Sequence, residues 1–386
     1  MRRAIAFALA SVTGLVFAGS IRGAPEPSPT PRPLLAPGEE KFLANLRQLT
    51  FAGQNAEAYW SADGGRLIFQ SDEGSLPCDQ IFAMSADGSG RRRISNGEGK
   101  TTCSYFFPDG ERVVYASTFR AGAACPPRPD RSRGYVWALD DYDIYTARAD
   151  GTDTKPLFAS PAYDAEATIS PDGKTIVFTS ARDGDLEIYT MNADGSGVRR
   201  LTHTPGYDGG AFFSDDGKKI VYRADHPTAP EDLERYRENL SRHTYAPRSL
   251  EIRVMNADGS NDHAVTQNGA ANFAPFFLPG GREIIFSSNL SDPKGREFEL
   301  YLIREDGTGL TQVTFSPDFD GFPMLTRDGK RIVFASNRNG VKPHETNIFV
   351  ADWIRKPPRA AAERRLGPKP GFRSSASPRQ TGGGPG

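Results

Sequence analysis

Oxygen-bearing side chains recur at one position of a repeat that runs through most of this 386-residue chain. In chain order the position holds Asn55, Thr101, Asp164, Asp208, Asn272 and Asp320. If the repeats close into a ring, these side chains converge at the mouth of a central channel. There they could bind a ligand such as a calcium ion or another divalent cation, an ammonium group or the hydroxyls of a sugar. The alternative interpretation is that they cap local turns where strands begin.

Other residues that could do chemistry give weaker signals. Glu57 and Glu166 follow two of the ring positions by two residues and could add negative potential. Paired carboxylates such as Asp164 with Glu166 could act as acid and base. His203, His226 and His243 fall in one repeat and His344 in the last, without the tight spacing typical of a metal site. Hydrolase, zinc-peptidase and nucleotide-binding motifs are absent from the sequence. We therefore expect no catalytic residues and no certain cofactor, with an enzyme as the alternative.

The three cysteines are Cys78, Cys103 and Cys125. The repeat pattern places all of them on one face of two neighbouring repeats. In an oxidising compartment this composition predicts one disulfide and one free thiol. The sequence alone does not select the pair, but Cys78 and Cys125 lie in loops and have the most freedom to meet.

The repeat itself begins with a turn of three residues that ends in Gly. The turns occupy residues 62–64, 108–110, 171–173, 215–217, 279–281 and 327–329. Each precedes a β-branched and aromatic run such as Ile176-Val177-Phe178, which predicts a hairpin. A second hairpin follows, with an Asp-Gly turn such as Asp194-Gly195 and a closing strand that ends in a pair such as Leu201-Thr202. Each unit is therefore a four-stranded meander, with strands A to D.

Six such meanders predict an all-β fold. A single meander cannot bury both of its faces, and repetition at about 40–50 residues is typical of a β-propeller, in which each sheet packs on its neighbours. We expect a six-bladed β-propeller with four-stranded antiparallel blades. The sixth unit lacks its last strand, while an extra strand over residues 47–50 precedes the first unit. This N-terminal strand is expected to close the ring as the outer strand of blade six, which removes an exposed edge.

Several repeat motifs resemble the TolB-like β-propeller family of exported bacterial proteins. They are Leu49-Thr50, Ser170-Pro171-Asp172-Gly173 and the segment 191–197, and the resemblance extends over about residues 47–353. TolB itself has an additional N-terminal domain, so the resemblance implies a propeller-only relative. It also implies a partner in the cell envelope, such as a protein like the peptidoglycan-associated lipoprotein. Related propellers in oligosaccharide lyases and peptidases imply the alternative, a carbohydrate- or peptide-acting enzyme with its site at the channel mouth.

Two connections between strands B and C are unusually long. In blades two and four they hold 28 and 29 residues, against 9 to 13 elsewhere. In a propeller they project from the same face as the connections between blades, and ligands often meet such loops. The blade-four loop predicts a helix over 231–242, with Leu233, Tyr236 and Leu240 on one side. That side either packs on the propeller or binds a partner.

The termini indicate export. Arg2 and Arg3 precede a short apolar run, and Val16 and Ala18 suit cleavage after residue 18. The predicted organisation is a signal peptide at 1–18, a Pro-rich spacer at 19–38, the propeller at 39–354 and a basic, disordered tail at 355–386. A net charge of −1 argues against a nucleic-acid partner. We expect a monomer of the periplasm or the extracellular space that does not span the membrane after cleavage.

Overall fold

The computed structural model describes residues 33–355, apart from residues 75, 133, 293, 294, 296, 343 and 344. The predicted signal peptide, the spacer before residue 33 and the tail beyond Arg355 lie outside the described residues. In the described part of the chain, no helix is long and apolar enough to cross a membrane.

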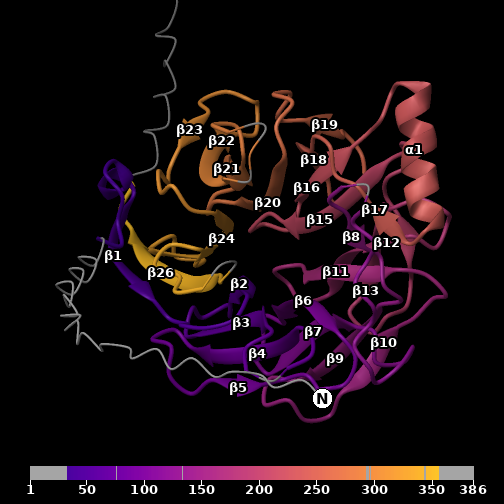
Figure 1. Ribbon diagram of the computed structural model, residues 1–386, viewed down its shortest axis with the longest axis horizontal. Helices are drawn as coiled ribbons and strands as arrows, with labels where there is room; N and C mark the ends of the chain where they lie inside the picture. Colours follow the sequence, from indigo (N-terminus) through magenta and orange to yellow (C-terminus); the bar gives the residue numbers. More distant parts are fainter. Residues whose placement is uncertain are drawn as a thin grey trace, which may run out of the picture. The chain divides into compact units, whose positions relative to one another are not determined.

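Six four-stranded antiparallel sheets surround a central channel, which confirms the predicted propeller (Figure 1). Blades one to three consist of β2 (Asn55–Trp60), β3 (Arg66–Ser71), β4 (Gln80–Ser85) and β5 (Arg92–Arg93); β6 (Thr101–Phe106), β7 (Arg112–Ser117), β9 (Asp143–Arg148) and β10 (Lys155–Phe158); and β11 (Asp164–Ile169), β12 (Thr175–Ser180), β13 (Glu187–Asn192) and β14 (Arg199–Arg200). Blades four to six consist of β15 (Tyr207–Phe213), β16 (Lys219–Asp225), β18 (Glu251–Asn256) and β19 (His263–Ala264); β20 (Asn272–Phe277), β21 (Glu283–Ser288), β22 (Glu299–Arg304) and β23 (Thr311–Gln312); and β24 (Asp320–Leu325), β25 (Arg331–Ser336), β26 (Asn347–Trp353) and β1 (Leu43–Gln48).

The apolar runs of the second strands form the core. In β12, Ile176, Val177 and Phe178 are fully buried although consecutive side chains point to opposite faces of the sheet. Both faces are buried because each blade is packed between two neighbours. Phe178 also contacts Tyr189 of the next strand, with ring centroids 5.8 Å apart. The sequence therefore shows continuous apolar runs where a one-sided sheet would alternate.

The N-terminal strand closes the ring. β1 pairs with β26, and Leu43 lies opposite Trp353 while Gln48 lies opposite Phe349. Leu49 continues the pairing by donating its N–H to the Ile348 carbonyl, at 2.8 Å. The strand begins four residues before the predicted segment 47–50, because the apolar side chains of Leu43 and Leu46 also pack into the core of blade six.

The recurring threonine of the Leu-Thr pairs, whose place Ser95 takes in blade one, has a structural role. Its hydroxyl accepts the N–H of the second residue in the neighbouring strand C, which the outer strand is too short to satisfy. The bonds are Ile81 to Ser95 (3.0 Å), Ile188 to Thr202 (2.9 Å), Ile252 to Thr266 (2.9 Å), Leu300 to Thr314 (2.8 Å) and Ile348 to Thr50 (2.9 Å). The motif therefore secures the edge of each of these blades.

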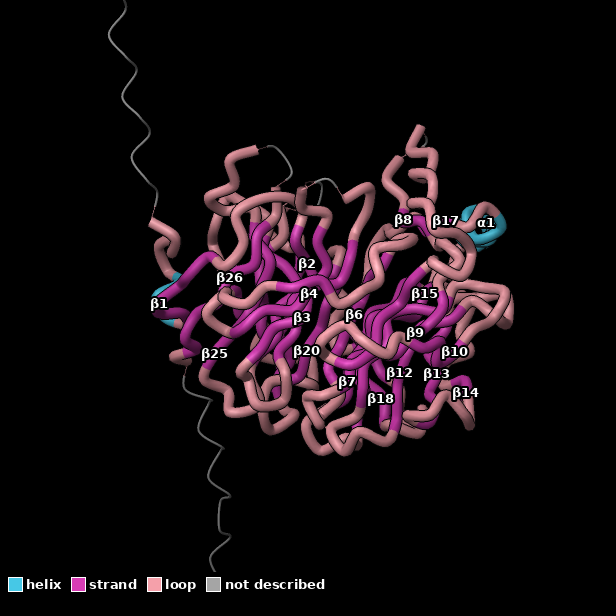
Figure 2. The backbone as a smooth tube through the Cα atoms, turned by 90° about the horizontal axis from the view of Figure 1, so that it is seen from below, coloured by secondary structure: helices cyan, strands magenta, loops and turns pink. Residues whose placement is uncertain are grey.

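The two long loops meet on one face of the propeller, which we call the long-loop face (Figure 2). β8 (Trp137–Ala138) of the blade-two loop pairs with β17 (Thr244–Tyr245) of the blade-four loop. The predicted helix is α1 (Pro230–Ser241), and its apolar side packs into a cluster with Tyr207 and Leu250 of blade four. This side of the helix is therefore occupied by the protein's own core.

Candidate functional site

The six predicted ring residues lie at the beginnings of the innermost strands, but they are buried between blades. Asn55, Thr101, Asp164, Asp208, Asn272 and Asp320 are all 0% exposed. Asp164 accepts a hydrogen bond from Arg182 (3.0 Å), Asp208 contacts His226 (2.8 Å) and Asp320 accepts from Arg338 (2.5 Å). Asn55 donates to the Thr346 carbonyl, Thr101 to the Asp79 carbonyl and Asn272 to the Leu250 carbonyl. The three Asp side chains thus bond within their own blades, and the other three side chains reach the preceding blade. None of the six is among the residues that line the channel cavity, and their contact with a ligand stays a prediction.

The channel is lined by the residues two positions further along each strand. They are Glu57, Cys103, Glu166, Gly210, Ala274 and Phe322. All six have a left-handed backbone, with φ between 49° and 62°, and each coincides with a shift in the pairing register. Each is thus the extra residue of a β-bulge, which redirects its side chain. Left-handed φ values are costly for residues other than Gly, so the six-fold packing must hold them in place.

An aromatic layer closes the channel below this level. Tyr59 and Tyr105 both contact Phe212, with ring centroids 5.4 and 6.0 Å apart, and Phe212 contacts Phe276 at 5.6 Å. These rings come from four different blades. A second cavity on the other side of the layer is lined by Tyr105, Phe212, Phe276 and Met324. We call the cavity above this layer, which is lined by Glu57, Cys103 and Glu166, the upper cavity. The aromatic layer is its floor, and its volume of about 20 Å³ is room for about one water molecule.

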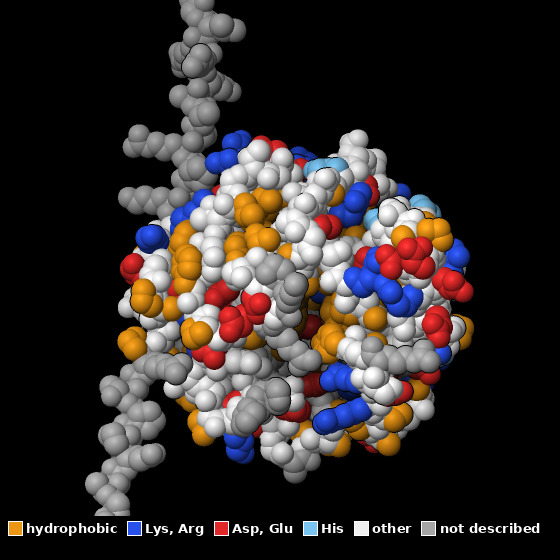
Figure 3. Space-filling view, turned by 45° about the horizontal axis from the view of Figure 1, so that its top comes forward, with side chains coloured by type: hydrophobic (Ala, Val, Ile, Leu, Met, Phe, Trp, Pro, Cys, Tyr) orange, Lys and Arg blue, Asp and Glu red, His pale blue; other side chains and the backbone are white. Residues whose placement is uncertain are grey.

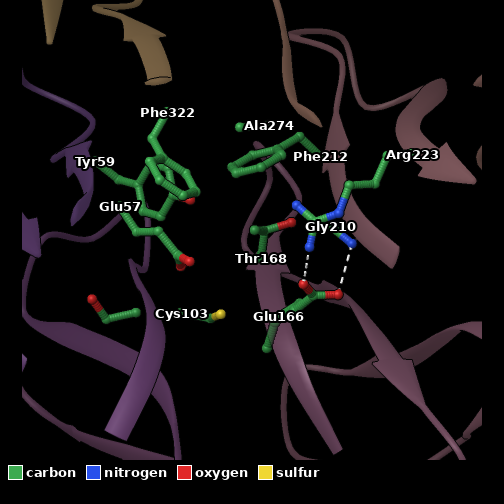
Figure 4. Close-up of a pocket in the computed structure, with 12 residues that line it drawn as sticks. Glu57, Tyr59, Cys103, Glu166, Thr168, Gly210, Phe212, Arg223, Ala274 and Phe322 are labelled. Carbon is green, nitrogen blue, oxygen red and sulfur yellow. Dashed lines mark hydrogen bonds and ion pairs between the residues drawn. The ribbon is translucent and has the colours of Figure 1, made fainter. Parts of the chain in front are cut away.

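Glu166 is fully engaged within the protein. Its carboxylate accepts hydrogen bonds from Thr179 (2.8 Å), the Gly210 N–H (2.9 Å) and the Tyr207 hydroxyl (3.2 Å), and it pairs with Arg223 (Figure 4). Arg223 also donates to the Tyr207 hydroxyl at 3.0 Å. The Glu166 and Arg223 charges thus offset each other, and neither is left for a ligand.

Glu57 differs from Glu166, although both point into the same space (Figure 4). Among the described residues, its hydrogen-bond partner is the Cys103 thiol. Burial raises the pKa of Glu57 to about 7, and the nearby Glu166 carboxylate contributes in the same direction. Burial and the two carboxylates hold the pKa of the Cys103 thiol well above its usual range, so the thiol stays protonated.

A further polar atom in the cavity has no partner. Ser104 lines the cavity and is 2% exposed, and its hydroxyl makes no hydrogen bond within the described part of the chain. A buried hydroxyl without a partner costs about 1–3 kcal/mol. The cavity therefore offers a ligand one carboxylate and one unsatisfied hydroxyl.

A cluster of aromatic side chains from blades five and six reaches the cavity through Phe322. We call Phe273, Phe298, Phe319 and Phe322 the phenylalanine wall; all four are half-buried. Phe273 contacts Phe298 at 5.0 Å and Phe322 at 5.2 Å. Gly321 permits this packing, because a Cβ there would lie 2.5 Å from Phe319. Figure 3 shows acidic, basic and hydrophobic side chains gathered around a hollow near the middle of the visible face.

The remaining candidates do not assemble into a second site. Cys78 and Cys125 form a disulfide with Cα atoms 5.9 Å apart, and Cys103 is free. His226 contacts Asp208, His203 and His243 are exposed, and His344 lies outside the described residues. Within the described ranges, no group of three or more His, Cys, Asp and Glu side chains is arranged to hold a metal ion.

The sequence points to Glu57 and Glu166 as added negative potential, while the aligned oxygen-bearing residues that it suggests for the channel lie two positions earlier. The lining residues are two acids, a thiol, a glycine, an alanine and a phenylalanine. They share a backbone conformation but no chemistry. The only feature of the sequence that could have identified them is that each follows one of the buried polar residues by two positions.

Comparisons with known proteins agree with this architecture. The family described as TolB beta propeller domain matches residues 128–231. A protein TolB homolog from Chlorobium luteolum is 24% identical in an alignment of 148 residues that covers 32% of this chain and 34% of the relative. The match thus spans about a third of that relative's length.

Two solved structures have a similar fold. The putative TolB from Agrobacterium tumefaciens gives a TM-score of 0.50 at 19% identity, covering 78% of this chain and 91% of that one. TolB from Acinetobacter baumannii gives 0.51 at 15% identity, covering 78% and 64%. At these identities the likeness concerns the fold. Together, the comparisons and the six blades show a propeller similar to those of TolB proteins.

Proposed function

We propose that this TolB-like six-bladed β-propeller is a noncatalytic binding or scaffold protein of the bacterial cell envelope. Its ligand or partner meets the long-loop face at the channel mouth. The observation that carries the proposal is the upper cavity, which has an aromatic floor and contains Glu57. In the described part of the chain, the Glu57 carboxyl group forms a hydrogen bond with the Cys103 thiol and no ion pair. A buried charge without a countercharge is costly, so such a group is more common in a site than in a core.

Exposed apolar side chains on the same face support a macromolecular partner. Val341 is 86% exposed, Phe51 69% and Tyr135 53%, and they come from connections in three blades. Large apolar side chains around a recessed site are typical of a protein-binding surface. The relatives named TolB support a partner in the envelope, such as a protein like the peptidoglycan-associated lipoprotein.

The proposed location is the periplasm or the extracellular space. The N-terminal segment has the composition of a signal peptide, with predicted cleavage after residue 18. The disulfide between Cys78 and Cys125 is typical of an oxidising compartment. Cell fractionation with N-terminal sequencing tests the proposal. Exported protein that begins near Gly19 is expected, and full-length protein confined to the cytoplasm would contradict it.

Capture from an envelope extract tests the binding face. The immobilised protein should retain a specific partner, and the triple variant Phe51→Ser, Tyr135→Ser and Val341→Ser should lose it. The control variant is Val198→Ser with Leu310→Ser, which changes two exposed apolar residues that follow hairpin turns on the opposite face. Equal capture by the two variants would place the binding surface elsewhere.

One observation favours an enzyme as the second candidate. A carboxyl whose pKa is about 7, as for Glu57, is suited to general acid–base catalysis at neutral pH. A carbohydrate- or peptide-acting lyase or hydrolase would then have its site at the channel mouth. Turnover of oligosaccharide or peptide substrates by the wild-type protein, lost in Glu57→Gln, would establish this candidate in place of the binding protein.

A further inference from the structure

We propose that the upper cavity binds an alkylammonium group, with its nitrogen beside Glu57 and its hydrocarbon stem along the phenylalanine wall. The inference rests on the proposed function and names the chemistry that the channel recognises. The ammonium could belong to a lysine side chain of a partner or to a small free amine.

The charges around Glu57 favour a cation. The titratable and charged groups that face it include Cys103, Glu166, Arg223, Asp79 and the uncharged Tyr59 hydroxyl. Arg223 is the cation of this group, and Glu166 already offsets it. Lys100, which faces Asp79, is paired with Asp140 at 3.1 Å. The protonated Cys103 thiol adds no charge, so the region has an excess of negative charge that a bound cation would balance.

The small volume of the cavity favours an ammonium group over other cations. Room for about one water molecule suits an ammonium group, which presents three N–H donors. The Glu57 carboxylate and the unpartnered Ser104 hydroxyl supply oxygen acceptors. A guanidinium is a wider planar fork, and a calcium ion takes six to eight oxygen ligands. The second carboxylate in the cavity, Glu166, has its oxygens bonded to protein.

The phenylalanine wall beside the cavity favours a cation that carries a hydrocarbon stem. Phe322 lines the cavity, and it contacts Phe273 and Phe319, which lie nearer to the strand beginnings and hence to the long-loop face. A chain of methylene groups would exchange water for these rings, which contributes about fourfold in affinity for each methylene that is buried. Aromatic faces also attract cations. A bare inorganic ion would gain none of the apolar contribution from this wall.

Calorimetric titration with n-butylammonium chloride at constant ionic strength tests the inference. Wild-type protein should bind n-butylammonium more tightly than methylammonium, and should not bind n-butanol detectably. Glu57→Gln should weaken binding at least about tenfold at pH 8, and Ser104→Ala at least about threefold. The matched control is Glu111→Gln, which neutralises an exposed acid in the turn between β6 and β7 on the opposite face and should change the affinity less than about twofold. Thermal unfolding midpoints show whether each variant keeps its fold.

The pH dependence provides a separate readout. Because burial raises the pKa of Glu57 to about 7, the carboxylate is mostly protonated at pH 6 and mostly ionised at pH 8. If only the ionised form binds the cation, affinity should rise about tenfold between these pH values. The rise should be absent in Glu57→Gln. Equal affinity of wild type and Glu57→Gln, or displacement of n-butylammonium by an equal concentration of sodium or potassium, would overturn the inference.

Titration with a second ligand distinguishes the two possible sources of the ammonium group. Tighter binding of Nα-acetyl-lysine methylamide than of n-butylammonium identifies a partner's lysine, and the reverse identifies a free amine. Capture from the envelope extract separates this inference from the proposed function. If wild type and Glu57→Gln capture the same partner and n-butylammonium does not bind, the ammonium site is wrong while the binding function stands.

Discussion

Arg338 forms a buried ion pair with Glu39, a residue 299 positions earlier in the chain, and its Nη1 lies 2.9 Å from the Glu39 Oε2. The second guanidinium nitrogen bonds the other Glu39 oxygen at 3.0 Å and Asp320 at 2.5 Å. Glu39 belongs to a short 3-10 helix, η1 (Glu39–Lys41), just before β1. The ring is therefore closed by the β1–β26 pairing and by a buried charge network next to it.

Removal of this ion pair should destabilise the closed ring. Glu39→Ala leaves the buried Arg338 with less countercharge and should lower the free energy of unfolding by about 3 kcal/mol, measured by urea denaturation. The matched control is Asp109→Asn, because Asp109 pairs with Arg112 at 2.9 Å on the surface. An exposed pair contributes at most about 1 kcal/mol. Equal losses in the two variants would contradict a special role of Glu39.

Truncation tests closure more directly. Deletion of residues 39–51 removes β1 and should cause aggregation, because it exposes the edge of β26. Deletion of residues 358–386 should leave thermal unfolding almost unchanged. Light scattering and calorimetry compare the two proteins, and similar behaviour of both would refute the closure mechanism.

Stability should fall as pH rises above about 4.5. Burial and the neighbouring Asp320 carboxylate raise the pKa of Glu299 from 4.5 to about 9, so the folded protein holds a proton that the unfolded chain releases. This contribution is fully present below pH 4.5 and is lost as the pH rises to about 9, at up to about 1.4 kcal/mol per pH unit. Urea denaturation of wild type and Glu299→Gln across pH 5–9 measures it. A wild-type profile as flat as that of the variant would be incompatible with a buried proton.

The threonine hydroxyls at the blade edges should be worth more than exposed ones. Thr314→Val keeps the shape of the side chain but leaves the Leu300 N–H without its acceptor. The expected loss is about 1–3 kcal/mol in the free energy of unfolding. Thr204 is exposed, and Thr204→Val should have less than about 0.5 kcal/mol of effect. The prediction fails if the two substitutions cost the same.

Gly209 should tolerate no side chain. A Cβ at this position would lie 2.2 Å from the Tyr207 hydroxyl and 2.6 Å from the Glu166 carboxylate, so Gly209→Ala should disturb the Glu166–Arg223 pair and lower the unfolding midpoint. Gly122 offers the comparison, because a Cβ there would meet nothing within 4 Å. Gly122→Ala should be neutral or slightly stabilising, since it restricts the unfolded chain. Differential scanning calorimetry separates the two cases.

The disulfide and the free thiol can be counted chemically. Denatured, unreduced protein should contain one reactive thiol, that of Cys103, since Cys78 and Cys125 are joined. The double variant Cys78→Ala and Cys125→Ala should lose about 2–4 kcal/mol of stability. Three thiols in unreduced protein would show that the bridge does not form in solution.

The sequence by itself determined the blades, because their causes are local. Gly-ended turns such as Pro171-Asp172-Gly173, followed by a run such as Ile176-Val177-Phe178, specify hairpins wherever they occur, and six copies specify the number of blades. The incomplete sixth unit required a strand from elsewhere, and β1 supplies it. Only tertiary structure decided the channel lining. Regular alternation would put Asn55 and Glu57 on the same side of their strand, but the left-handed bulge at Glu57 separates them. Packing of six strands around one axis imposes that bulge, and residue types as different as Glu57 and Phe322 give no local signal for it.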